Sequence, residues 1–125
     1  MSKLITESEV QNATVLLASR DYNTELMRNN SGAVTTEDGR HVRFGLGNDS
    51  KRVNKNFKSS DLIGICGDDG KLVAIECKKP GWKYKGDERE RAQKNFIDFV
   101  LSRKGKAGFS QSIEDSERIL KNGKI

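Results

Sequence analysis

Two acidic residues and a lysine flank a pair of apolar runs in the middle of the chain. Asp61 precedes the first run, and Glu76 and Lys78 close the second. The four residues 67–70, Gly-Asp-Asp-Gly, separate the runs and are typical of a tight β-turn. We therefore predict a β-hairpin within residues 59–80. Because both runs are almost wholly apolar, we expect its strands at the centre of a sheet, buried on both faces.

The pairing of this hairpin decides whether the charged groups meet. A two-residue loop at 68–69 pairs residue 61 with residue 76, so Asp61 and Glu76 lie opposite each other with Cβ atoms about 5 Å apart. Side chains alternate between faces along a strand, which places Lys78 on the same face. A three-residue loop with a left-handed Gly70 would shift this register by one, and a bulge would then be needed to restore it.

Two carboxylates at such a distance repel each other unless a cation lies between them. Oxygen ligands of this kind suit Mg²⁺ or Mn²⁺. A neighbouring lysine can orient or deprotonate a water molecule, or stabilise charge that develops on a phosphate. A purely structural interpretation stays open, because strands often end in charged residues at the protein surface and Asp61 is a common turn residue.

The same residues carry a family resemblance. Ser60-Asp61 followed by Glu76-Cys77-Lys78 resembles the signature of the PD-(D/E)XK nucleases, and the flanking residues resemble its VRR-NUC branch, which is similar to Holliday junction resolvases. The resemblance implies that Asp61, Glu76 and the backbone carbonyl of Cys77 bind the metal and that Lys78 assists the attacking water. Ser60 stands where the name of the signature has a proline, and the residue at this position varies among such motifs.

The resemblance also implies roles for residues outside the hairpin. Glu7, in a Glu-x-Glu-aliphatic pattern, corresponds to a further catalytic and metal-binding acid, and Gln93 to a catalytic glutamine that faces the attacking water or the phosphate. Arg28 and Ser31 correspond to residues near the scissile phosphate. Three of these residues have a structural alternative: Glu7 suits a helix N-terminus, Gln93 is an ordinary helix residue, and Arg28 is an ordinary charge at a sheet edge.

The charge of the chain favours a polyanionic partner. The 125 residues carry a formal charge of +5, with an isoelectric point near 9.3, which is typical of nucleic-acid-binding proteins. Residues 46–60 show no sustained periodicity and are predicted to form a loop, either beside the phosphate backbone or as a mobile solubilising segment. The basic residues predicted to contact nucleic acid near the hairpin are Lys51, Arg52, Lys55, Lys58, Lys79 and Lys83.

Composition excludes several classes of protein. No run approaches the ~18 apolar residues of a membrane span, and the first ten residues lack the apolar core of a signal peptide, so we expect a cytoplasmic protein without a membrane partner. Cys66 and Cys77 are expected to be buried thiols. Two cysteines and one histidine, His41, do not complete an ordinary zinc site.

Local signals outline the remaining elements. Thr6 and Glu9 form a capping box for a first helix, and Asp87 and Glu90 form one for a second. Leu16 and Phe99 are expected on the apolar faces of these helices. The other predicted elements are a strand at 25–29, a hairpin at 33–45 that either pairs with the sheet edge or forms an arm over the substrate, a strand at 106–110 and a helix after Ser112.

These elements predict a single α/β domain over residues 1–125, with a mixed β-sheet flanked by helices. The resemblance refines this to the restriction-endonuclease-like fold: an α-β-β-β-α-β core with an extra hairpin and a C-terminal helix. It implies a Mg²⁺-dependent (or Mn²⁺-dependent) homodimeric endonuclease acting on branched or structured DNA, such as a Holliday junction or flap. The alternative is a nuclease-like module that binds DNA without cutting it.

Overall fold

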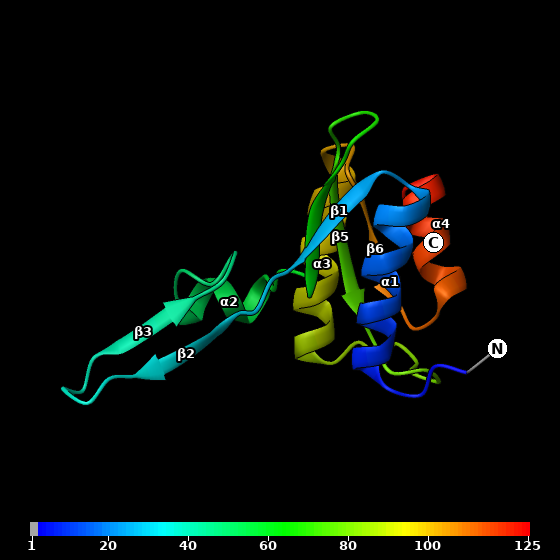
Figure 1. Ribbon diagram of the computed structural model, residues 1–125. Helices are drawn as coiled ribbons and strands as arrows, with labels where there is room; N and C mark the ends of the chain where they lie inside the picture. The colour runs from blue at the N-terminus through cyan, green and yellow to red at the C-terminus, as the bar shows by residue number, and fades with distance from the viewer. Residues whose placement is uncertain (1–2) are drawn as a thin grey trace.

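The computed structural model describes residues 3–125 and contains four helices and six strands in this part of the chain (Figure 1). In chain order they are α1 (Glu7–Asp21), β1 (Thr24–Arg28), β2 (Gly32–Thr35), β3 (His41–Phe44), α2 (Lys51–Asn56), β4 (Leu62–Cys66), β5 (Leu72–Cys77), α3 (Glu88–Ser102), β6 (Lys106–Ser110) and α4 (Ile113–Asn122).

Four strands form one mixed sheet in the order β1-β4-β5-β6. Strand β4 pairs antiparallel with both β1 and β5, whereas β6 runs parallel to β5. Helices α1 and α4 pack together on one face of this sheet, and α3 covers the other (Figure 1). The fold is therefore α/β, with a mixed sheet flanked by helices, as the sequence predicts.

Alternate side chains of the two central strands pack into two separate hydrophobic cores, one on each face of the sheet. Val73, Ile75 and Cys77 face α1 and α4, and Ala74 faces α3. Glu76 has the same parity as Ala74 and therefore also faces α3. The apolar runs thus hold the sheet between its two layers of helices, while the acidic end of β5 lies under α3.

Strands β2 and β3 form a second, two-stranded sheet. We call residues 32–44, which comprise these strands and their turn, the arm. Figure 1 shows the arm projecting away from the main sheet, so the hairpin does not pair with the edge of that sheet. The base of the arm is held by the buried Asn48, whose side-chain amide donates to the carbonyls of Gly32 and Phe44 at 2.8 and 2.9 Å.

Helix starts follow the predicted capping residues. Thr6 and Glu9 form the expected reciprocal capping box of α1, and Asp87 and Glu90 form that of α3. Ser112 caps α4 by accepting a hydrogen bond from the backbone N–H of Asp115.

Three expectations about the helices are wrong. Residues 46–60, predicted as a loop, contain the short helix α2, which Ser50 caps and which packs on α3. Leu16 lies on the outer side of α1 and is 61% exposed, whereas Thr14 is buried, with its hydroxyl satisfied by a 2.6 Å hydrogen bond to Ser116 of α4. Phe99 of α3 is also largely exposed.

Candidate active site

The hairpin of β4 and β5 has the predicted register. Leu62 pairs with Ile75, so one step further along the ladder Asp61 lies opposite Glu76. The turn itself differs from the two-residue loop: the Cys66 N–H donates to the Lys71 carbonyl at 2.8 Å, which leaves the four residues 67–70 in the loop, and the Gly70 N–H donates to the Cys66 carbonyl within it. Gly70 is left-handed, with φ +73°, yet the register is not shifted and no bulge is needed.

The two carboxyl groups interact directly at the end of the hairpin. Asp61 Oδ2 accepts a hydrogen bond from the Cys77 N–H at 3.0 Å, which fixes it across the strand pair. Glu76 is only 4% exposed. Its burial, a hydrogen bond with the Asp61 carboxyl and the negative charge of Asp61 together raise the pKa of Glu76 to about 9. Without a cation, this pair therefore retains one proton at neutral pH.

Lys78 is held on the same side of the sheet by α3. Its Nζ donates to Gln93 Oε1 at 2.8 Å, and Gln93 is buried. The ammonium lies 5.4 Å from the ring centroid of Trp82 and 5.8 Å from that of Phe109, distances at which aromatic faces attract a cation. Trp82 is itself fixed, because its Nε1–H donates to Glu90 at 2.8 Å. The lysine head is thus oriented by partners on three segments.

Glu7 approaches this group from the N-terminus of α1. Partial burial and the charge of Asp61 raise the pKa of Glu7, while Lys78 and Arg89 oppose the shift. The Glu7 carboxyl therefore lies close enough to Asp61 and Lys78 for their charges to shift its pKa. Within residues 3–125, however, no group of three or more His, Cys, Asp or Glu side chains that could hold a metal ion is found. The structure therefore brings Asp61 and Glu76 together and leaves Glu7 at their edge.

The donor set at the hairpin end suits a hard divalent cation. Two carboxylates that share a proton offer the same position to a cation, which would relieve their repulsion and displace the proton. The Cys77 thiol is buried, and burial raises the pKa of this thiol, so it stays neutral. Its backbone carbonyl is then the only group by which Cys77 could contribute, and oxygen is the atom that Mg²⁺ and Mn²⁺ prefer.

A polar cleft of about 360 Å³ opens beside the carboxyl pair. Its walls come from the β1–β2 connection, the arm, α2 and α3, and they include Asp61, Glu76 and Gln93. Three cationic side chains also line it: Arg43, Lys58 and Arg89. The cleft thus combines acidic and cationic groups, as a site for a phosphodiester and a divalent ion requires.

Sequence reasoning missed two of these cations. Arg89 precedes Gln93 by four residues in α3, so both project from one face of the helix, and this spacing was a usable signal. Arg43 donates to Asn48 at 3.0 Å and reaches the cleft from the arm. Nothing in the sequence indicated where the arm lies.

The predicted nucleic-acid contacts divide into four groups. Ser31 and Lys58 line the cleft, whereas the Arg28 guanidinium donates to Asn12 of α1 and is not part of the cleft wall. Lys55 lines a neighbouring cleft of about 380 Å³, together with Tyr84 and Arg91. The other four are exposed, two on α2 and two in the loop after β5: Lys51, Arg52, Lys79 and Lys83.

No family model, curated protein or solved structure matches this chain. In the part of the chain that the structure describes, no helix is both long and apolar enough to cross a membrane.

Proposed function

We propose that this chain is a metal-dependent endonuclease of the PD-(D/E)XK type that hydrolyses phosphodiester bonds in branched or structured DNA. One observation carries the proposal: Asp61 and Glu76 meet on the α3 face of adjacent strands, with Lys78 next along the same face. The order of the core elements, α1-β1-β4-β5-α3-β6, agrees with the α-β-β-β-α-β arrangement that the resemblance implies.

Asp61, Glu76 and the backbone carbonyl of Cys77 would hold the metal ion, and Glu7, whose pKa is raised in part by the charge of Asp61, would be the third acid. When bound, Mg²⁺ or Mn²⁺ would lower the pKa of a water molecule and stabilise charge on the phosphate.

The chain's own groups account for the other requirements of hydrolysis. The cationic side chains of Arg43, Lys58 and Arg89 would bind the DNA backbone in the cleft and neutralise charge that develops on the phosphate. The Lys78 amine, oriented by Gln93, would hydrogen bond to the attacking water and fix its direction. Burial of Glu76 limits access of bulk water to the pair.

A second candidate is a nuclease-like module that binds DNA without cutting it. It is favoured by one observation: residues 3–125 contain no three-residue acidic group ready to hold a metal ion. This candidate keeps the cationic cleft and its salt-sensitive DNA binding, but it gives no products under any metal condition.

The decisive experiment incubates the purified protein and its Asp61→Asn and Lys78→Ala variants with four-way junction, flap, duplex and single-stranded DNA. Cleavage by the wild-type protein that requires Mg²⁺, is abolished by EDTA and is lost in both variants supports the endonuclease. The variants should still bind DNA in the presence of EDTA. Binding without cleavage of any of the four DNAs would support the second candidate instead.

A further inference from the structure

Five lysines gather at the end of the main sheet that lies opposite the carboxyl pair. They line a groove of about 420 Å³ between the β4–β5 turn, the ends of α3 and α4, and the start of β6. We call this surface the lysine groove, after its five cationic side chains: Lys71, Lys104, Lys106, Lys121 and Lys124. Among the described residues that line it, Asp69 is the only acid, so the groove carries a strong positive charge.

Capping of the two helix ends does not account for these lysines. A lysine near a helix C-terminus commonly bonds to the last carbonyls of the helix. Here the backbone N–H groups of residues 103–105 donate to carbonyls in the last turn of α3, and the Gly123 N–H donates to the Ile119 carbonyl of α4. Of the five lysines, Lys106 alone contributes, because its Nζ donates to the Leu120 carbonyl at 3.0 Å. Hydrogen bonding to the helix ends therefore explains one lysine and leaves four.

The charge of the lysine groove is not neutralised within the chain. The side-chain ion pairs of residues 3–125 lie elsewhere, and none of them includes one of the five lysines. The Asp69 carboxylate accepts a hydrogen bond from the Lys71 backbone N–H at 3.0 Å. This bond, together with the charges of Lys106 and Lys71, lowers the pKa of Asp69. One carboxylate faces five ammonium groups, so the groove attracts an anionic partner.

The hydrogen-bond donors of the groove suit an extended polyanion better than a small phosphate. Sites for a single phosphate commonly use backbone N–H groups that converge on the ligand. In the lysine groove, the backbone N–H groups of four lining residues already donate within the chain: Lys71, Lys104, Gly105 and Gly123. The donors that remain are ammonium groups on long flexible stems, which can follow a repeating anionic backbone without fixed geometry.

The lining also differs from that of a protein–protein interface. The centres of such interfaces are rich in aromatic side chains and poor in lysine. The described residues that line the lysine groove include no aromatic side chain, and Leu101 is their only large apolar one. An almost uniformly cationic lining instead complements the phosphate backbone of DNA, which carries one negative charge per nucleotide.

The lysine groove and the cleft lie at opposite ends of β5. Lys71 directly precedes this strand and Glu76 lies near its end, so their Cα atoms are on the order of 15 Å apart at the rise of an extended strand. Figure 1 shows the β4–β5 turn and the last turns of α3 and α4 at one end of the main sheet, whereas the arm, which forms part of the cleft wall, leaves from the other end. A DNA segment in the cleft would therefore leave the lysine groove accessible to another segment.

We propose that the lysine groove binds the phosphate backbone of a second DNA segment while the cleft holds the first. A branched DNA presents two such segments on one molecule, so the second contact is intramolecular and strengthens the first. The inference rests on the branched DNA of the proposed function but not on cleavage. Binding measured in EDTA therefore tests it separately from catalysis.

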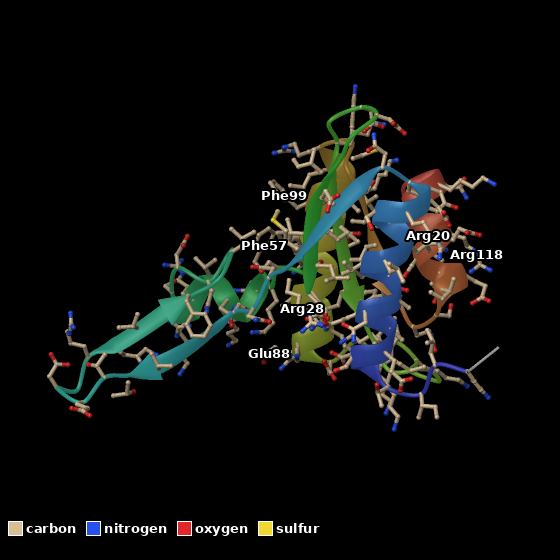
Figure 2. The ribbon with its side chains drawn as sticks, in the orientation of Figure 1. Arg20, Arg28, Phe57, Glu88, Phe99 and Arg118 are labelled. Atoms are coloured by element: carbon tan, nitrogen blue, oxygen red, sulfur yellow. The ribbon has the colours of Figure 1, made fainter. Side chains whose placement is uncertain are left out.

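The test measures the binding of a four-way junction and of a hairpin-closed duplex of about one helical turn by fluorescence anisotropy in EDTA. The salt concentration is about 0.15 M, at which exposed charges more than about 8 Å apart are largely screened. The groove variant combines Lys104→Glu with Lys121→Glu. The control variant combines Arg20→Glu with Arg118→Glu, which changes the net charge equally on α1 and α4, outside both surfaces (Figure 2). All four positions are exposed, so melting curves should show that both variants keep the fold.

The wild-type protein should bind the junction more tightly than the short duplex. The groove variant should bind the junction at least tenfold more weakly than wild type but the duplex less than threefold more weakly, because the cleft alone holds the duplex. The control variant should bind both DNAs within threefold of wild type.

Three results would overturn the inference. Equal losses in the groove and control variants would show that affinity follows overall charge. Equal losses for junction and duplex in the groove variant would show that a single DNA segment contacts both surfaces. Unchanged junction affinity in the groove variant would show that the groove does not bind DNA; if inorganic tripolyphosphate then raises the Tm of wild type alone, the groove is a site for a small anion.

Discussion

Lys78 and Gln93 are joined by a 2.8 Å hydrogen bond that connects the end of β5 to the buried face of α3. The ammonium would otherwise have the freedom of a long flexible side chain, which orders a reacting water poorly. The bond makes Gln93 a positioning residue for Lys78. The chemistry assigned to the lysine therefore depends on an amide that the sequence shows only as a polar residue in a helix.

Gln93→Leu should lower kcat about 10-fold or more while changing KM little, because the acceptor that orients Lys78 is lost and the cationic cleft is retained. Steady-state cleavage of the preferred DNA at saturating Mg²⁺ measures this. Gln93→Glu keeps an acceptor oxygen and should retain more activity, and Asp98→Asn, on the exposed side of α3, is the control. Equal kcat in Gln93→Leu and wild type would contradict the positioning role.

Glu76→Gln should make the metal-free protein more stable at alkaline pH. The pKa of Glu76 in the folded protein is about 9 and the ordinary pKa of a glutamate is 4.5, so above pH 4.5 the unfolded chain releases a proton that the folded chain keeps. The free energy of unfolding therefore falls as pH rises through this window. Glutamine does not titrate and removes this loss, which grows by about 1.4 kcal/mol for each pH unit between these two values.

Melting curves in EDTA between pH 4 and 9 test this expectation. The Tm advantage of Glu76→Gln over wild type should grow with pH, while Glu25→Gln, an exposed substitution on β1, should show no such trend. A variant whose advantage shrinks as pH rises would show that Glu76 is ionised in the folded protein. The same variant should be inactive, because stability and activity conflict at a site built to hold a cation.

Arg89→Ala should weaken binding to every DNA about tenfold, because Arg89 lines the cleft and would contact the phosphate backbone. The slope of log binding constant against log salt concentration should fall in magnitude by about one. Arg118→Ala is a matched control, since Arg118 lies on α4, away from the cleft (Figure 2). An equal loss in both variants would show that DNA binding depends on overall charge and not on the cleft.

Asn48→Ala should loosen the arm without unfolding the main sheet. The side chain of Asn48 donates to the carbonyls of Gly32 and Phe44 and accepts from Arg43. Losing these hydrogen bonds should lower the local stability of the arm by about 1–3 kcal/mol. Hydrogen exchange should then accelerate at the amides of β2 and β3, with exchange in β4 and β5 nearly unchanged. Uniform acceleration in both sheets would mean that the arm does not open independently.

The hairpin and the helix starts could be predicted because their signals are local. The apolar runs, the Gly-Asp-Asp-Gly turn and the capping boxes at Thr6 and Asp87 depend on residues a few positions apart. The opposition of Asp61 and Glu76 follows from the same local geometry, since a short turn and a side-chain period of two fix it. This part of the candidate site was therefore accessible from the sequence.

The rest depends on tertiary placement. Helix α2 has six residues and Val53 as its only large apolar side chain, so it shows no periodicity. Leu16 was expected inside because of its helical spacing, but the buried side of α1 carries Thr14, whose hydroxyl bonds to Ser116, 102 residues further along the chain. Arg43 reaches the cleft only because the arm, which carries it, forms part of the cleft wall. Signals of this kind do not exist within a short window of sequence.

The most direct test of the account titrates Mn²⁺ into the metal-free protein at pH 8 by isothermal calorimetry. Wild-type protein and Glu25→Gln should bind the ion at the carboxyl pair and release a proton as they do so, which is visible as a dependence of the heat on the buffer. Asp61→Asn and Glu76→Gln should lose this binding. Equal binding by all four proteins, or none by the wild type, would contradict the claim that Asp61 and Glu76 together hold a divalent cation.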